Sequence, residues 1–122
     1  MYMKDLEPAI HRQRLIIEGH YDIEFNGDVV KDYLAKLSEI LDMTIFSGPF
    51  CWPPDKWNHP EVDLHDWNGF VAWTESGCHV YAFPKHRFFT SDIYSCKAFN
   101  NNRVVEFTKE FIKSEDLVFQ AL

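Results

Sequence analysis

The densest group of chemically reactive residue types lies between Trp73 and His79, where the chain reads Trp-Thr-Glu-Ser-Gly-Cys-His. A serine, a histidine and a carboxylate are the members of a hydrolase triad, so hydrolysis is the first chemistry to consider. The stretch lacks the Gly-x-Ser-x-Gly turn that exposes a nucleophilic serine, and in most chains some serine can be paired with some histidine. The residue types alone therefore do not specify a hydrolase.

A second group of candidate residues, His59, Glu61, Asp63 and His65, occupies alternate positions further upstream. Alternate side chains of an extended chain point the same way, so these four could converge on a metal ion. Their spacing matches no established zinc pattern, and a solvated acidic loop explains them as well. We therefore expect no metal site. Cys51 has no nearby cysteine in the sequence and is interpreted as a small buried residue or a free loop thiol.

A longer match begins at the same stretch. It continues without a gap from Glu75-Ser76, through Phe83-Pro84, to the segment Asp92-Ile93-Tyr94-Ser95-Cys96. This part of the chain resembles the prokaryotic S-adenosylmethionine decarboxylases, small pyruvoyl-dependent enzymes of spermidine synthesis. In that family a Glu-Ser pair is followed by a strand, an aromatic-Pro turn and a second strand that ends in Asp-x-aromatic-small-Cys. The interval between the serine and the cysteine is also the same.

The resemblance extends upstream of the Glu-Ser pair. Leu15-Ile16-Ile17-Glu18 looks like the first strand of the family, with its acidic residue in place. Asn68-Gly69-Phe70-Val71 falls where the family has a small hydroxyl residue, a glycine and a hydrophobic run. The order of helices and strands fits along nearly the whole chain.

The resemblance implies a self-made cofactor. Decarboxylation of an amino acid leaves a carbanion that needs an electron sink, and no ordinary side chain supplies one. In the family, the serine hydroxyl attacks the preceding carbonyl, and the resulting ester eliminates to give a pyruvoyl group, which binds the substrate amine as a Schiff base. Here that would cut the chain between Glu75 and Ser76, leaving residues 1–75 and 76–122. Cys96 would be the general acid, and Glu18 would assist near the substrate. Gly77 suits the strained turn that self-attack requires.

Two positions depart from the residues that help processing in the family. Asn68 stands in place of a hydroxyl residue, and Tyr81 stands in place of a histidine. Asparagine can still donate a hydrogen bond to an oxyanion, but tyrosine, with a pKa of about 10, is no base near neutral pH. His79, two residues before Tyr81 and on the same face of the predicted strand, is the available substitute. The residue after the nucleophile is usually histidine in the family and is Gly77 here.

The substrate and the activity have open alternatives. The first prediction is decarboxylation of S-adenosylmethionine, and acidic residues of the 51–66 segment suit an arginine or ornithine substrate as well. The loss of the processing histidine motivates another alternative, an unprocessed, non-catalytic relative that serves as a binding or regulatory subunit. Phe50 and Trp67 are expected to contact the substrate, because their aromatic rings could stack on an adenine. The same holds for the rings of Trp52 and Trp57. The other interpretation is that these aromatic residues form a hydrophobic lid.

The pattern of apolar residues predicts the elements that position these groups. Alternation and β-branched runs predict one or two strands over residues 15–25, and a helical stripe predicts a helix over 28–42 with Asp28 as its N-cap. Further strands are predicted at 44–46, 70–73, 78–83, within 88–98 and at 117–119, and a second helix at 101–113. Residues 1–12 are expected to be a loose lead-in. Four prolines and their neighbours predict a long loop over 47–66.

This order of elements predicts a single α+β domain over residues 1–122, a two-layer sandwich of a mostly antiparallel sheet with two helices on one face. Such a sandwich leaves one sheet face open, and the many aromatic residues make dimerisation across it plausible. The resemblance points the same way, because family members are often homodimers that build each active site from two subunits. We therefore expect a homodimer that acts on a small molecule.

Composition excludes several other classes. The chain has 122 residues, of which 46% are hydrophobic, and a formal net charge of −7. The acidic balance disfavours nucleic-acid binding, because phosphate backbones are repelled. No apolar run reaches the length of about 20 residues that crosses a bilayer, and the first residues lack the apolar stretch of a signal peptide. Three cysteines, an odd number, indicate reduced thiols and a cytoplasmic protein.

Overall fold

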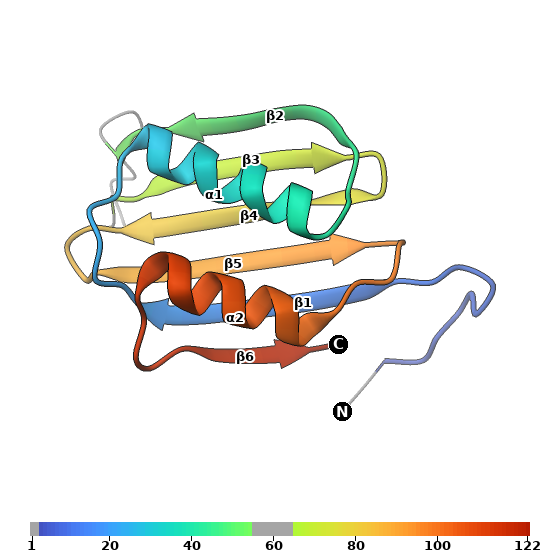
Figure 1. Ribbon diagram of the computed structural model, residues 1–122. Coiled ribbons are helices and arrows are strands. Elements are labelled where there is room, and N and C mark those ends of the chain that lie inside the picture. Colours follow the sequence, from blue (N-terminus) through green and yellow to red (C-terminus); the bar gives the residue numbers. More distant parts are fainter. Residues whose placement is uncertain (1–2, 55–64) are drawn as a thin grey trace.

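The computed structural model describes residues 3–54 and 65–122. Its elements in chain order are β1 (Gln13–His20), α1 (Gly27–Ile40), β2 (Ile45–Trp52), β3 (Trp67–Trp73), β4 (Ser76–Phe83), β5 (Phe88–Ser95), α2 (Asn101–Ile112) and β6 (Val118–Ala121) (Figure 1). The strands form one sheet in the order β2-β3-β4-β5-β1-β6. Every neighbouring pair of strands is antiparallel.

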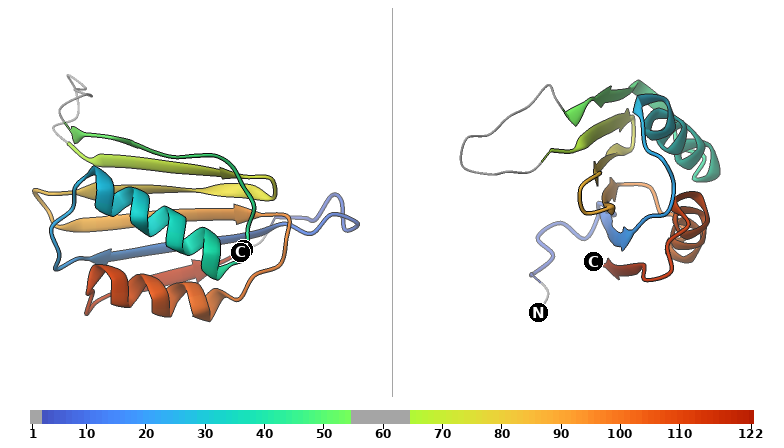
Figure 2. Two further views of the ribbon diagram at one scale, coloured as in Figure 1. Left: turned by 45° about the horizontal axis from the view of Figure 1, so that its top comes forward. Right: turned by 90° about the vertical axis from the view of Figure 1, so that its left-hand side faces the viewer.

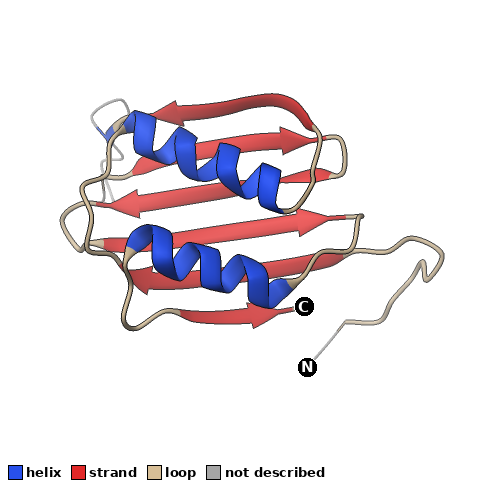
Figure 3. Ribbon diagram, in the orientation of Figure 1, coloured by secondary structure: helices blue, strands red, loops and turns tan. Residues whose placement is uncertain are grey.

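Both helices pack on the same face of this sheet. The view along the sheet edge shows α1 and α2 side by side on one side of the curved strands (Figure 2), and the colouring by secondary structure shows the two layers directly (Figure 3). The predicted two-layer α+β sandwich is therefore confirmed. Neither described helix is long and apolar enough to cross a membrane.

The helices form because an apolar stripe and an N-cap coincide in each. In α1 the Asn26 side chain accepts a hydrogen bond from the Val29 N–H at 2.9 Å, so Asn26, and not the predicted Asp28, is the N-cap. Asn100 caps α2 in the same way through the Arg103 N–H. Lys113 then ends α2 in the left-handed conformation, as is common at helix C-termini.

The core lies between the helices and the covered face of the sheet. Every second residue of the central strands is buried there, and the buried apolar residues include Leu15, Ile17, Val71, Val80 and Ile93 from the strands and Val30, Leu34, Leu37, Val104 and Ile112 from the helices. The few polar groups in this layer are paired, as burial demands. The Tyr33 hydroxyl lies 2.8 Å from the Thr108 hydroxyl, and the Trp73 indole N–H donates to Ser38 Oγ at 2.7 Å.

The other face of the sheet, which we call the open face, carries the alternate residues. No described helix covers it (Figure 2). Strand register arranges its central residues in rows across the sheet. One row contains Phe50, Phe70, His79, Asp92 and Ile16, and the next contains Trp52, Asn68, Tyr81, Thr90 and Glu18.

Two predicted boundaries are wrong. The chain after Phe46 does not enter a loop, because β2 continues to Trp52; its pairing with β3 shifts register around Gly48, whose φ is +94°, and this irregularity accommodates the glycine and proline. Residues 21–26 form no strand, although Tyr21 and Phe25 pack together with ring centroids 4.6 Å apart. The remaining elements lie within a few residues of the predicted positions.

Candidate active site

The tight turn between β3 and β4 consists of Thr74 and Glu75 and places Ser76 at the first position of β4. The turn is anchored to the segment before β2 by two hydrogen bonds. The Thr74 N–H donates to the Thr44 carbonyl at 3.0 Å, and the Thr44 N–H donates to the Glu75 carboxylate at 3.1 Å. The latter bond is the main cause that lowers the pKa of Glu75 below its usual value. The Glu75–Ser76 peptide is therefore held in one place.

Ser76 itself has an unusual backbone. Its φ is +145°, in a region that residues with a Cβ rarely adopt and that glycine adopts readily. The sequence predicted that Gly77 supplies the flexibility at this turn. The unusual backbone conformation lies instead at Ser76, one residue earlier. Gly77 has a different requirement, because a Cβ added there would lie 2.6 Å from the Val71 carbonyl oxygen. Backbone strain therefore sits on the candidate nucleophile.

The carbonyl of Glu75 points at Cys96. The Cys96 N–H donates to this oxygen at 2.9 Å, and the Cys96 thiol donates to the same oxygen at 3.3 Å. Two donors on one carbonyl polarise it and would stabilise negative charge that develops on its oxygen during attack by a nucleophile. Ser76, Glu75 and Cys96 thus form one group at the β3–β4 turn, which we call the hairpin group.

The strain at Ser76 leads to a stability prediction. Ser76→Gly and Ser76→Ala both remove the hydroxyl group and differ only in the Cβ. A residue with a Cβ in such a conformation costs about 1–3 kcal/mol, and the larger entropy of unfolded glycine offsets about 0.5–1 kcal/mol. We expect the free energy of unfolding in urea to be about 1 kcal/mol higher for Ser76→Gly than for Ser76→Ala.

The matched control for that comparison is Ala72→Gly, in β3. Ala72 lies in a strand and does not have a positive φ, so glycine there should lower the free energy of unfolding by about 0.5–1 kcal/mol. A Ser76→Ala variant that is at least as stable as Ser76→Gly would show that the backbone at Ser76 is not strained.

A second group of predicted residues, which we call the open-face group, consists of Glu18, Asn68, His79 and Tyr81. His79 Nε2 lies 2.7 Å from Asn68 Oδ1. The His79 ring stacks on the Tyr81 ring with a centroid distance of 4.7 Å and an interplanar angle of 13°, which confirms that the two residues share a face. Glu18 accepts a hydrogen bond from the Thr90 hydroxyl at 3.0 Å, and Thr90 is the cross-strand neighbour of Tyr81.

The surroundings set the protonation of the two rings. Partial burial lowers the pKa of His79, and its carboxylate neighbours Asp92 and Asp66 oppose this only in part. Partial burial also raises the pKa of Tyr81, and the same two carboxylates add to the rise. Near neutral pH, His79 is therefore a neutral imidazole and Tyr81 a neutral phenol.

The two groups do not meet within one chain. His79 is three residues and Tyr81 five residues from Ser76 along β4, which corresponds to about 10 Å and about 16 Å at the usual strand rise. Asn68 lies opposite Tyr81 in the strand register, so its contact with His79 draws the imidazole towards Tyr81 and away from Ser76. The hairpin group and the open-face group are separate constellations in the single chain.

The two aromatic residues predicted at the substrate lie on opposite faces. Phe50 is on the open face, 42% exposed, with its ring centroid 6.1 Å from that of Trp52. Trp67 lies on the covered face, where it is half buried against the core and its ring approaches the start of α1. The prediction that Trp67 binds the substrate is not supported by this position, because strand alternation turns it away from the open face.

Sequence reasoning gave no role in the site to two residues of the open face, Thr90 and Asp92. Thr90 holds Glu18, and Asp92 lies opposite His79 in the register. The alternation in residues 88–95 places both on one face, but nothing in the sequence says which residues of β1 and β4 they oppose. Within residues 3–54 and 65–122, no group of three or more His, Cys, Asp or Glu side chains is placed to hold a metal ion. His59, Glu61 and Asp63 lie outside the described residues, as does Trp57.

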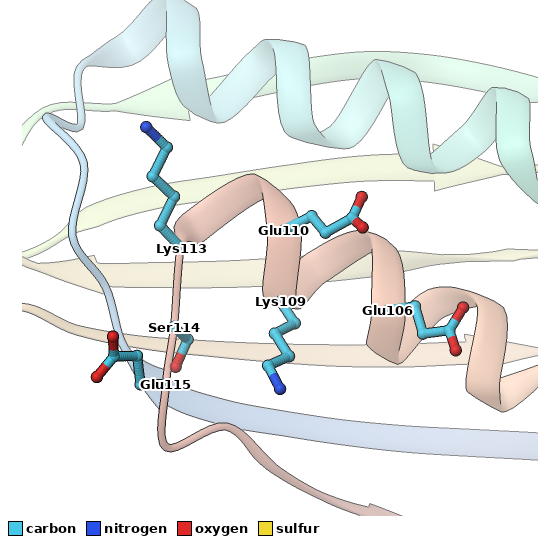
Figure 4. A pocket seen from close by; sticks show the side chains of 6 residues that line it. All are labelled: Glu106, Lys109, Glu110, Lys113, Ser114 and Glu115. Atoms are coloured by element: carbon cyan, nitrogen blue, oxygen red, sulfur yellow. The ribbon is translucent and has the colours of Figure 1, made fainter.

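Two surface hollows among the described residues lie away from these groups. One is lined by Glu106, Lys109, Glu110, Lys113, Ser114 and Glu115, which belong to α2 and the turn after it in the helical layer (Figure 4). Another is lined by residues of the N-terminal lead-in together with Arg14 and Leu122. Neither of these two hollows contains a residue of the hairpin group or of the open-face group.

Comparison with known proteins decides the family. A model of the S-adenosylmethionine decarboxylase family matches residues 22–122. The chain belongs to the S-adenosylmethionine decarboxylase family. The match includes every hairpin residue and all of the open-face group except Glu18, which precedes it. The resemblance seen in the sequence is thus confirmed, and a decarboxylase-type function is the one that the family supports.

The fold agrees with this assignment. The structure is similar to the crystal structure of the adenosylmethionine decarboxylase from Aquifex aeolicus, with a TM-score of 0.72 and 14% sequence identity over 93% of this chain and 89% of that chain. At this identity the similarity concerns the fold. No curated protein sequence matches the chain significantly. Membership of the S-adenosylmethionine decarboxylase family therefore rests on the family model, and the structural match supports its architecture.

Proposed function

We propose that the chain is a pyruvoyl-dependent decarboxylase of S-adenosylmethionine that serves spermidine synthesis and is made by self-cleavage between Glu75 and Ser76. The observation that carries the proposal is the hairpin group. A strained serine follows a carbonyl that already accepts two hydrogen bonds from Cys96. The residues present therefore fit the precursor of a pyruvoyl group.

The first task of the hairpin group is the attack on the chain itself. Ser76 Oγ adds to the Glu75 carbonyl carbon, and the Cys96 N–H stabilises the negative charge on the Glu75 oxygen. The bond between the Glu75 carbonyl and the Ser76 nitrogen then breaks, the nitrogen takes up a proton, and Glu75 becomes esterified to Ser76. Relief of the strain at Ser76 favours this step, because the positive φ belongs to the peptide-linked form.

The second task is the decarboxylation. A pyruvoyl group at residue 76 supplies the electron sink that the loss of carbon dioxide requires. Cys96, which directly follows β5, remains beside this position, and its exposed thiol is the proton donor for the product carbon. The carboxylates of Glu18 and Asp92 on the open face suit a positively charged substrate. This charge is shared by S-adenosylmethionine, arginine and ornithine, so the last two are the alternative substrates.

The separation of the two groups supports a homodimer. Ile16, Phe50, Trp52 and Tyr94 leave apolar surface exposed on the open face. A second copy packed on this face would bury that surface and bring the open-face group of one chain to the hairpin group of the other. The site would then be complete only in the dimer.

The test is the mass of the freshly purified protein, followed by its activity. Two fragments, residues 1–75 and a pyruvoyl-blocked 76–122, are the expected result, and carbon dioxide release should be greatest with S-adenosylmethionine. Release of carbon dioxide from arginine or ornithine, and not from S-adenosylmethionine, would show that one of these two amino acids is the substrate. A single uncut species of about 14.5 kDa with an unmodified Ser76 would instead leave the non-catalytic alternative.

A further inference from the structure

We propose that Lys97 stabilises the carboxylate that Glu75 releases when the chain cuts itself, and that it thereby speeds the elimination that follows ester formation. This inference rests on the proposed self-cleavage between Glu75 and Ser76. It adds to the hairpin group a positively charged side chain to which no role was assigned from the sequence. Lys97 directly follows Cys96, whose N–H donates to the Glu75 carbonyl.

Backbone hydrogen bonds fix the position of Lys97 beside the hairpin group. The Lys97 N–H donates to Ser95 Oγ at 2.9 Å. Ser95 is fully buried and is the cross-strand partner of Ser76. The Cys96 N–H, between these two residues, donates to the Glu75 carbonyl at 2.9 Å. Residues 95–97 therefore pass directly beside the peptide that is proposed to break.

The ammonium group of Lys97 reaches the turn between α1 and β2. Its Nζ donates to the Asp42 carbonyl at 2.6 Å and lies 3.8 Å from the Asp42 carboxylate. This carboxylate is fully exposed, so the ion pair contributes little, and the bond to the carbonyl determines where the ammonium lies. The last turn of α1 contains no basic residue, so Lys97 also supplies the positive charge that the C-terminal end of a helix favours.

The same turn anchors Glu75. Thr44, two residues after Asp42, donates its N–H to the Glu75 carboxylate at 3.1 Å. This bond is the main cause that lowers the pKa of Glu75, and the positive charge of Lys97 also contributes to the decrease. The ammonium group is therefore held on one side by Asp42 and lies close enough to Glu75 for its charge to act there.

Self-cleavage adds a negative charge to this place. Glu75 would then carry its side-chain carboxylate together with a new α-carboxylate, and the Asp42 carboxylate lies in the neighbouring turn. Like charges at such short range repel one another, although water at an exposed site screens part of the effect. The positive charge of Lys97 offsets this repulsion, so the carboxylate of Glu75 is a better leaving group with the lysine in place.

The new charge is formed in the elimination. After the ester has formed, a Brønsted base such as water takes the Cα proton of Ser76, and the electron pair forms the Cα–Cβ double bond. The bond from Cβ to the ester oxygen breaks, and its electron pair leaves with Glu75 as the carboxylate that ends the chain of residues 1–75. In the preceding attack Glu75 exchanges an amide for an ester and gains no lasting charge. Lys97 therefore acts on the second step.

Hydroxylamine separates the two steps, because it cuts an ester and leaves an amide intact. Precursor from cell-free synthesis is followed by intact mass, with and without hydroxylamine. The chains compared are wild type, Lys97→Gln, Lys97→Arg and the control Lys109→Gln, whose lysine is exposed on α2. Without hydroxylamine, Lys97→Gln should form the fragments 1–75 and pyruvoyl-blocked 76–122 about 10-fold more slowly than wild type, because one nearby charge is lost. Lys97→Arg and Lys109→Gln should match the wild type.

With hydroxylamine, Lys97→Gln should be cut at least as fast as wild type and should give a 76–122 fragment with a free Ser76. A merely structural role of the lysine would disturb the hairpin group and slow this cut as well, and that result overturns the proposal. Circular dichroism checks that each variant is folded. Lys97→Met, which keeps the alkyl chain without the charge, takes the place of Lys97→Gln where the latter does not fold.

Two further results also count against Lys97. Blocked fragments formed by Lys97→Gln at the wild-type rate, or a Lys97→Arg chain as slow as Lys97→Gln, would overturn its role while leaving self-cleavage in place. A wild-type chain that stays whole with and without hydroxylamine would instead contradict the proposed function, and this inference with it.

Discussion

Ser76→Ala should leave the chain whole and without decarboxylase activity. Alanine keeps the Cβ and the hairpin but removes the hydroxyl, and no other group of the turn can become esterified to Glu75 and then eliminate to a ketone. Intact mass should show one species with the full chain mass, whereas we expect two fragments from the wild type. Carbon dioxide release should fall to the background of a reaction without enzyme.

Thr74→Ala is the matched control for this substitution. Thr74 carries a hydroxyl in the same turn, and its anchoring bond to Thr44 uses the backbone N–H, which alanine retains. We therefore expect Thr74→Ala to be cut like wild type. Fragments at the Glu75–Ser76 bond in Ser76→Ala would mean that cleavage comes from another agent, such as a contaminating protease.

The fold could be predicted because the period of the apolar residues is clear in most elements. Val30, Leu34 and Leu37 recur at helical spacing and are buried, and the alternation in residues 88–95 places its apolar members in the core. The boundary at Phe46 could not be predicted, because Gly48 and Pro49 usually end a strand. Here they occupy an edge strand at a change of register, where the lost pairing is tolerated.

The sequence could predict which residues belong to the candidate site, but not how they are arranged in space. The resemblance named Ser76, Cys96 and Glu75, and the structure brings these three together. It could not show that Asn68, His79 and Tyr81 form a separate group, because that depends on which residues of β3 and β4 are paired. The expectation that Trp67 stacks on the substrate came from its aromatic ring alone, and the composition of the segment does not reveal which face of β3 each aromatic residue occupies.

The positive φ of Ser76 was likewise invisible to sequence reasoning, which assigned the flexibility to Gly77. Backbone strain depends on how the Thr74–Glu75 turn joins two strands whose positions are fixed by their other neighbours. Anchoring of the turn by Thr44 and of the Glu75 carbonyl by Cys96 imposes the conformation from both sides. The structure therefore adds a physical reason to propose self-cleavage at this peptide.

Cys96→Ala should separate the two tasks of the hairpin group. The backbone N–H that donates to the Glu75 carbonyl at 2.9 Å is retained in alanine, so self-cleavage should remain largely intact. The thiol, which is the proposed proton donor, is lost, so turnover should fall about 10²–10⁴-fold. Intact mass measures the first effect, and carbon dioxide release from the cleaved protein measures the second.

Cys51→Ala provides the comparison with a cysteine outside the site. Cys51 lies in β2, half buried against the core, and its thiol donates to the Trp52 carbonyl at 3.9 Å. Both cleavage and turnover should match the wild type. Equal turnover of Cys96→Ala and wild type would remove the thiol from the chemistry, whereas loss of cleavage in Cys96→Ala would mean that the thiol at 3.3 Å, and not the backbone N–H, stabilises the charge on the Glu75 oxygen.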